Sequence, residues 1–198
     1  MYAAHPNFWR AGAISSTAVM LVVLGFLTVD SLAVTRAGGA NVPPYSVINK
    51  QIRYEYDHAA GRDRPVIGAD EPIFGRIYSE ADAEALMRKG KLTLQSRNCM
   101  NCHTFFGNGA YYAPDLTKAW LDPAWPQMWM PMTQSDTREK AMVAFLMNPD
   151  KYPTWERMMP NLRLTQEEAE AVTAYLKWMS AVETNGFPIH FGHIQPNK

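Results

Sequence analysis

The chain has 198 residues, and its 19 basic and 19 acidic side chains give a formal net charge of zero. This balance argues against nucleic-acid binding, because proteins that bind nucleic acids carry an excess of positive charge. Once a membrane segment is set aside, the length suits one domain, and the 14 prolines favour long ordered loops over a regular helical bundle.

An uncharged apolar run lies near the start of the chain. Residues 11–29 would span ~28 Å as a helix, close to the ~30 Å hydrocarbon thickness of a bilayer. The aromatic and basic residues Phe8-Trp9-Arg10 precede the run as an interface anchor. A cleaved signal peptide is the alternative, since Ser31-Leu32-Ala33 resembles a cleavage site, but the run is longer than a usual signal-peptide core. We therefore predict a single membrane anchor helix within residues 1–36.

Residues 37–78 connect this anchor to the rest of the chain. The segment has too many bulky side chains for a free linker, so we predict that it is ordered; these are Tyr45, Ile48, Ile52, Tyr54, Tyr56, Ile67, Ile73 and Phe74. No stretch of the following domain, residues 79–198, alternates convincingly as a strand. The predicted fold class is therefore all-α.

Three helices are predicted in residues 79–198. Ser79 followed by Asp82 is a capping signal for a helix over 79–97, in which Gly90 marks either a close helix–helix contact or a flexible break. A shorter helix is predicted over 137–147, with its end set by Asn148-Pro149. The clearest helix is 165–180, which begins with a Thr-x-x-Glu capping box; its apolar face has helical spacing, and Lys177 falls off that face toward solvent.

The two cysteines of the chain lie in the stretch NCMNCHTFFGNGAYYAP, residues 98–114. Cys99, Cys102 and His103 form C-x-x-C-H, the pattern for covalent attachment of haem c. A thioredoxin-type pair would need a βαβ context, which is lacking, and a zinc site would leave His103 without a role. The haem interpretation uses all three residues, with two thioethers and His103 as the proximal iron ligand.

The sixth iron ligand determines the chemistry of such a site. A methionine sulfur makes the haem an electron carrier, whereas an open position would bind small molecules. Met-Pro occurs twice, and proline stiffens the loop that holds the sulfur. We predict Met159, whose loop can cross the haem face before the last helix packs back, with Met158 and Met130 as competitors.

Two longer stretches resemble the cytochrome c subunit of bacterial nitric oxide reductase: NCMNCHTFFGNGAYYAPDL and MMPNLRLTQEEAEAVTAYLKWMSAVETNGFP. The resemblance is loose over residues 8–36 and close over 79–191. Its most specific parts are the glycine–tyrosine loop around Gly109 and Tyr111 and the sequence Tyr-Leu-Lys-Trp at 175–178. The inserted segment 37–78 is longer than the family's usual connection, and the Trp120–Met132 loop is fuller.

The resemblance implies an electron-transfer subunit with no catalytic site of its own. It would have a class I cytochrome c-like periplasmic domain over residues 79–198, and it would take electrons from a soluble periplasmic donor, a cytochrome c or a cupredoxin. It would pass them to a large integral-membrane subunit with haem b and non-haem iron, which reduces two NO to N2O. The family also implies a calcium ion at the subunit interface, held here by Gly109 and Tyr111; the alternative is that the glycines only shape a turn.

The same interpretation implies a place in the cell. Covalent haem attachment of this kind occurs on the outer face of the bacterial inner membrane, so the N-terminus would be cytoplasmic and the haem domain periplasmic. Two other functions remain open from the sequence. One is the haem c subunit of a related haem–copper oxygen reductase, and the other is a stand-alone membrane-tethered cytochrome c shuttle, which would need a long flexible tether.

Overall fold

The structure is a computed structural model that describes residues 5–39, 42–152 and 159–188. It divides into two compact units, one built on helix α1 and one that begins at Val42. The described part is mostly helical, as the sequence predicts, with α1 followed by four further α-helices.

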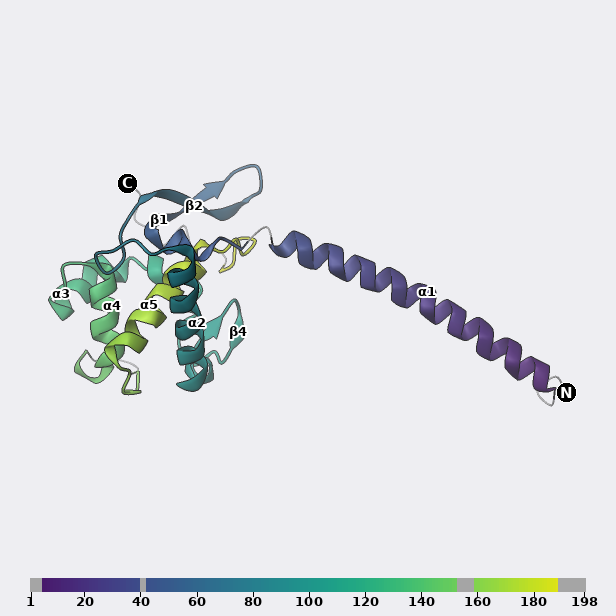
Figure 1. Cartoon of the computed structure of the whole chain (residues 1–198). Helices are drawn as coiled ribbons and strands as arrows, with labels where there is room; N and C mark the ends of the chain where they lie inside the picture. Colours follow the sequence, from purple (N-terminus) through teal and green to yellow (C-terminus); the bar gives the residue numbers. More distant parts are fainter. Residues whose placement is uncertain (1–4, 40–41, 153–158, 189–198) are drawn as a thin grey trace. The chain divides into compact units, whose positions relative to one another are not determined.

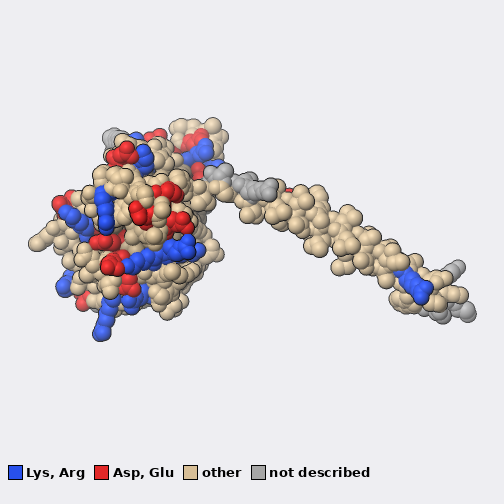
Figure 2. All heavy atoms as spheres, in the orientation of Figure 1, with Lys and Arg blue, Asp and Glu red and all other residues tan. Residues whose placement is uncertain are grey.

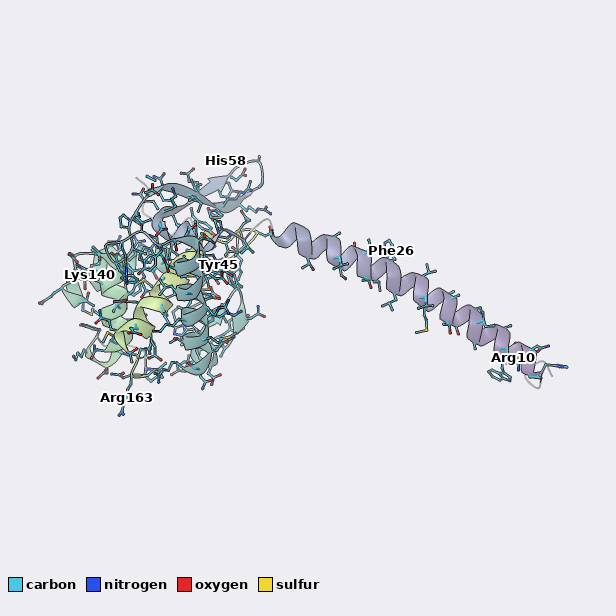
Figure 3. The ribbon with its side chains drawn as sticks, in the orientation of Figure 1. Arg10, Phe26, Tyr45, His58, Lys140 and Arg163 are labelled. Carbon is cyan, nitrogen blue, oxygen red and sulfur yellow. The ribbon has the colours of Figure 1, made fainter. Side chains whose placement is uncertain are left out.

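Helix α1 (Pro6–Gly39) is longer than the predicted apolar run. Its stretch from Pro6 to Thr35 has a mean hydropathy of 2.1 in its most apolar part and is long and apolar enough to cross a membrane. The hydroxyls of Ser15 and Thr28 donate to carbonyls one turn earlier, each at 2.8 Å, so these polar groups are satisfied within the helix. Figure 2 shows α1 almost free of charged side chains, and Figure 3 labels Arg10 and Phe26 along it.

The second unit starts with a 3₁₀ turn, η2 (Tyr45–Asn49), and an antiparallel hairpin of β1 (Lys50–Asp57) and β2 (Arg62–Asp70). Ile52 and Tyr54 are buried while their neighbours along β1 are exposed, the period of two expected of a half-buried strand. These strands are not predicted from the sequence. The hairpin closes because the Asp57 carboxylate accepts hydrogen bonds from two turn amides.

Two long helices form the centre of this unit. Helix α2 (Glu80–Ser96) begins at Ser79, whose hydroxyl accepts from the Asp82 amide, and α5 (Gln166–Ala181) begins with the complete Thr165–Glu168 capping box. Both helix predictions are confirmed. The two helices cross each other (Figure 1), and a Cβ atom at Gly90 of α2 would lie 2.3 Å from the Ala171 carbonyl oxygen of α5. Gly90 is therefore a close helix–helix contact and not a flexible break.

The remaining elements cover this pair. Helix α4 (Arg138–Met147) lies where a short helix was predicted and buries Met142 against α5. The Trp120–Met132 stretch, expected as a loop, contains short helical turns. They are η4 (Ala119–Leu121), the π-helical turn η5 (Trp125–Trp129) and α3 (Met130–Thr133), with η6 (Pro149–Lys151) after α4.

Two hydrophobic clusters hold these elements together. The larger joins α4, α5 and the tryptophan-rich turns to Val47, Ile52 and Tyr54 of the connecting segment. The smaller places Ile48 and Ile73 against α2 and α5. Tyr45, labelled in Figure 3, packs on this smaller cluster with its ring 5.8 Å from that of Trp178. The described connecting segment from Val42 onward is thus part of the fold of the second unit.

Lys177 departs from its sequence prediction. Helical spacing predicts it in solvent, but its side chain is 1% exposed and its Nζ lies 2.7 Å from a Glu71 carboxylate oxygen, with the Trp120 ring centroid 4.9 Å away. Burial lowers the pKa of Lys177, and Glu71 opposes that change. Helical periodicity missed this because the partner lies 106 residues earlier in the chain.

Replacing Glu71 by glutamine should lower the free energy of unfolding by about 2 kcal/mol. The variant leaves the Lys177 ammonium buried without its counter-charge, and the partial exposure of Glu71 reduces the loss below that of a fully buried pair. Urea unfolding of the full chain in detergent, followed by tryptophan fluorescence, measures the change. The exposed pair Lys50–Asp70 provides a neighbouring control, and Asp70→Asn should change stability by less than about 0.5 kcal/mol. Equal losses in the two variants would count against a special role for the buried pair.

Candidate haem-attachment site

The C-x-x-C-H motif lies on one turn immediately after α2. The helix ends at Ser96, and Asn98 adopts the left-handed conformation with φ 55°, which turns the chain into the 3₁₀ turn η3 (Cys99–Asn101). The Cys99 carbonyl accepts hydrogen bonds from the amides of Cys102, at 3.2 Å, and His103, at 2.9 Å. The backbone therefore holds both thiols and the imidazole within a single hydrogen-bonded turn.

The orientation of His103 is set by one hydrogen bond. Its Nδ1 lies 2.7 Å from the carbonyl oxygen of Pro114. A carbonyl can only accept, so this hydrogen bond requires the proton on Nδ1, and in that tautomer of imidazole the lone pair lies on Nε2. Metal-bound histidines typically donate their second nitrogen to a carbonyl in this way. Sequence reasoning included Pro114 in the motif-bearing stretch but did not assign this contact.

The surroundings of the two cysteines fit covalent haem attachment. Cys99 and Cys102 are not joined to each other by a disulfide, both are half-buried, and Cys99 packs against the larger hydrophobic cluster. Burial raises the pKa of the Cys99 thiol, which does not suit a reactive thiolate. In the described ranges, no three His, Cys, Asp or Glu side chains gather as a metal site, and the His58 ring makes an edge-to-face contact with Tyr56. The donor set fits a haem with His103 as iron ligand better than it fits zinc.

The loop after the motif is built by its own polar groups. β3 (Thr104–Phe105) pairs with β4 (Asn108–Gly109) as a two-residue hairpin. The Asp115 carboxylate accepts from the Thr104 hydroxyl at 2.6 Å and from the Thr117 amide at 2.8 Å. The Leu116 amide donates to the Thr104 carbonyl at 2.9 Å. These bonds close the loop that brings Pro114 back to His103.

Gly109 and Tyr111 have separate places in this loop. Gly109 has φ 129°, and a Cβ atom there would lie 2.3 Å from the His103 carbonyl oxygen, so the position requires glycine for steric reasons. Tyr111 is 83% exposed, and its hydroxyl donates to the Gly107 carbonyl at 3.1 Å. This geometry supports the turn-shaping alternative for Gly109, and the calcium site stays a prediction.

The methionines predicted as iron ligands differ in their surroundings. Met159 is half-buried in the irregular segment before α5. Met158 lies outside the described residues. Met130 is the first residue of α3 and packs against the larger hydrophobic cluster. The packing of Met130 gives it a structural role. Met159 lies in a loop before α5, as its prediction as the sixth iron ligand requires.

The chain is similar in sequence to known proteins. The cytochrome c family profile matches residues 87–180. The C subunit of nitric oxide reductase from Stutzerimonas stutzeri is 25% identical over 118 residues, which are 60% of this chain and 75% of that protein. The C subunit from Paracoccus denitrificans is 27% identical over 113 residues, 57% of this chain and 71% of that protein. A cytochrome c domain implies haem c. The cytochrome c family profile therefore matches the part of the chain that contains Cys99, Cys102 and His103, and the chain is similar to the C subunit of nitric oxide reductase over more than half of its length.

Proposed function

We propose that this chain is a membrane-anchored c-type cytochrome that accepts electrons from a soluble periplasmic donor and relays them to the catalytic subunit of a nitric oxide reductase. The observation that carries the proposal is the attachment turn, in which Cys99, Cys102 and an oriented His103 lie together. The similarity to the C subunits of nitric oxide reductases supports the identity of the complex.

In the proposed site, Cys99 and Cys102 would hold the haem through thioethers, and His103 and Met159 would be the iron ligands. A haem held in this way would supply one-electron transfer and would not bind a substrate at its iron. The chain's own contribution is to fix the imidazole: Pro114 holds Nδ1, and the bonds of Asp115 hold the loop that presents Pro114.

Helix α1 supports a fixed membrane location. We propose that it anchors the chain in the bacterial inner membrane, with the N-terminus cytoplasmic and the haem domain periplasmic, because its apolar stretch suits a bilayer. A diffusing shuttle would need a long flexible tether, whereas the described part of the connecting segment packs into both hydrophobic clusters. This packing favours a fixed subunit over the shuttle.

The surface beside the attachment turn supports a docked partner. Met100, Phe106, Tyr111 and Tyr112 are all exposed apolar or aromatic side chains within thirteen positions of one another along the chain. Exposed apolar groups of this kind mark interaction sites when they gather. We propose that this loop faces the large membrane subunit.

Replacing Met159 by leucine should remove the methionine-to-iron absorption band of the ferric protein. Leucine fills a similar volume but offers no sulfur, so the haem should stay covalently attached while its reduction potential falls. Met130→Leu is the matched control and should keep both the band and the potential, because Met130 packs in the hydrophobic cluster. The reverse pattern would assign the sixth ligand to Met130.

Gentle detergent purification followed by turnover with NO and with O2 tests the proposal. We expect this chain to copurify with a large haem b subunit and the preparation to reduce NO to N2O. Recovery of the chain alone would reject a complex-based function, and turnover with O2 but not NO would assign the chain to an oxygen reductase.

A further inference from the structure

Lys118 is a buried lysine immediately after the loop that holds His103. Its side chain is 2% exposed, and its Nζ donates to the carbonyl oxygens of Val182, at 3.0 Å, and Ser180, at 3.4 Å. Val182 is the C-cap of α5. Carbonyls at a helix C-terminus lack intrahelical donors and carry partial negative charge, so an amine placed here satisfies them.

Thr117 extends this connection toward the attachment turn. It is fully buried, and its Oγ1 accepts from the Phe106 amide at 2.7 Å. Its carbonyl lies 3.5 Å from the Ser180 hydroxyl, whose nearer acceptor is the Leu176 carbonyl at 3.1 Å. Thr117 therefore joins the two ends of the 104–118 loop to each other, and Lys118 fastens the later end to the end of α5. Pro114, which orients His103, lies within the fastened loop.

The inserted hairpin covers the amine from the other side. The Tyr54 ring of β1 has its centroid 4.3 Å from Lys118 Nζ, and the Tyr54 hydroxyl donates to the Val182 carbonyl at 3.4 Å. Tyr54 is itself buried. Figure 1 shows the hairpin at one end of the α2–α5 pair. The Val182 carbonyl thus accepts hydrogen bonds both from Tyr54 of the hairpin and from Lys118 at the end of the 104–118 loop.

The charges around the amine come from three elements. Burial lowers the pKa of Lys118 to about 7, and Glu183, after α5, opposes this change. Glu183 is itself paired with β2, at 3.2 Å from Arg64 Nε and 4.0 Å from Arg62 Nε. Tyr54 contributes the electron-rich face of its ring.

We propose that Lys118 is a positioning residue for the haem ligand: it fastens the loop carrying Pro114 to the C-terminus of α5, and the inserted hairpin covers this fastening through Tyr54. The proposal rests on the proposed function only in naming His103 as the iron ligand. On this proposal, the hairpin of β1 and β2 keeps water away from the hydrogen bonds between Lys118 and the end of α5, which hold the loop that orients the His103 imidazole.

The fastening has a defined pH dependence. Opening of the 104–118 loop exposes Lys118 to water, where its pKa returns to 10.5. Between about pH 7 and 10.5 the opened state therefore binds more protons than the closed state, so opening becomes less favourable as the pH rises through that window. Below pH 7 both states are protonated and the dependence disappears.

Hydrogen exchange of the full haem-loaded chain in detergent, read by mass spectrometry at several pH values, tests the proposal. After correction for the intrinsic exchange rate, protection of peptides covering 104–118 should rise between pH 7 and pH 9 by up to tenfold per unit. In Lys118→Met the rise should vanish, and at pH 9 these peptides should exchange about tenfold faster than in the wild type. The solvent-exchange lifetime of the His103 Nδ1 proton, measured by NMR, should shorten in the same variant.

Two comparisons keep the test decisive. Lys140→Met removes an exposed lysine, labelled in Figure 3, and should match the wild type. If Lys118→Met does not fold, Tyr54→Leu removes the ring over the amine and should weaken the same peptides. Unchanged protection of 104–118, or an equal loss in α2 peptides, would overturn the proposal. Absence of covalent haem from the wild-type chain would instead reject the proposed function, and the exchange result would still stand for the loop.

Discussion

A chain in which both Cys99 and Cys102 are replaced by alanine should contain no covalently attached haem. The two residues are the only cysteines of the sequence, and they lie on the hydrogen-bonded turn that also presents His103. Loss of both thioethers leaves only axial ligands, which do not survive denaturation. Intact-mass measurement and haem staining of denatured protein should show the full haem mass in the wild type and none in the variant.

Met100 lies between the two cysteines and provides the matched control. Its side chain is 41% exposed, so Met100→Ala should keep the complete haem mass. A double-cysteine variant that still carries haem after denaturation would contradict the attachment turn. A wild-type chain without haem, expressed in a host that matures c-type cytochromes, would contradict it equally.

Replacing Gly90 by alanine should destabilise the second unit by about 2 kcal/mol. The added methyl would lie 2.3 Å from the Ala171 carbonyl oxygen and 2.9 Å from the Tyr175 Cβ, and both belong to the facing helix. Overpacking of this kind typically costs about 1–3 kcal/mol, and alanine recovers up to ~1 kcal/mol through its better helix propensity. Because the obstructing atom is backbone, the helices must move apart, which places the result near the upper end. Urea unfolding of the full chain measures the loss.

Gln95→Ala is the control within the same helix. Gln95 is exposed on α2, so alanine there should change the free energy of unfolding by less than about 0.5 kcal/mol. An equally small effect at Gly90 would show that α2 and α5 do not cross as closely as the structure has them. A large effect at both positions would point to α2 itself being marginally stable.

The helices could be predicted because their signals are local. Ser79 and Thr165 cap within three residues of their own position, and the apolar spacing of α5 needs no knowledge of its partners. The crossing at Gly90 could be predicted only as one of two alternatives, because the residue that approaches it, Ala171, is far away along the chain.

The hairpin was missed because its signals conflict. β1 alternates at Ile52 and Tyr54, and Gly61 with φ 65° closes the turn, which are strand and hairpin signals. β2, however, contains Pro65 and Gly68, which ordinarily demote a strand. The burial of Lys177 was missed for a different reason, since the groups that face its ammonium, Glu71 and the Trp120 ring, lie far away along the chain.

The residues of the candidate site also differ in whether the sequence could predict them. The three residues of C-x-x-C-H are close together in sequence and could be predicted as one motif. The Pro114 carbonyl that orients His103 and the Lys118 amine that fastens the loop carry no motif, because their roles depend on backbone geometry and on α5. The tight contact between Gly109 and the His103 carbonyl likewise appears only once the loop is folded.

The relay itself can be tested by a single-turnover measurement. The purified complex is reduced anaerobically and mixed rapidly with NO while the absorbance of its c-type haem and the formation of N2O are followed. We predict that the c-type haem of this chain is reoxidised as N2O forms, and that the Cys99 and Cys102 double variant forms N2O only to the extent that the large subunit's own electrons allow. A c-type haem that stays reduced while NO is consumed, or that is reoxidised by O2 and not by NO, would contradict the proposed function.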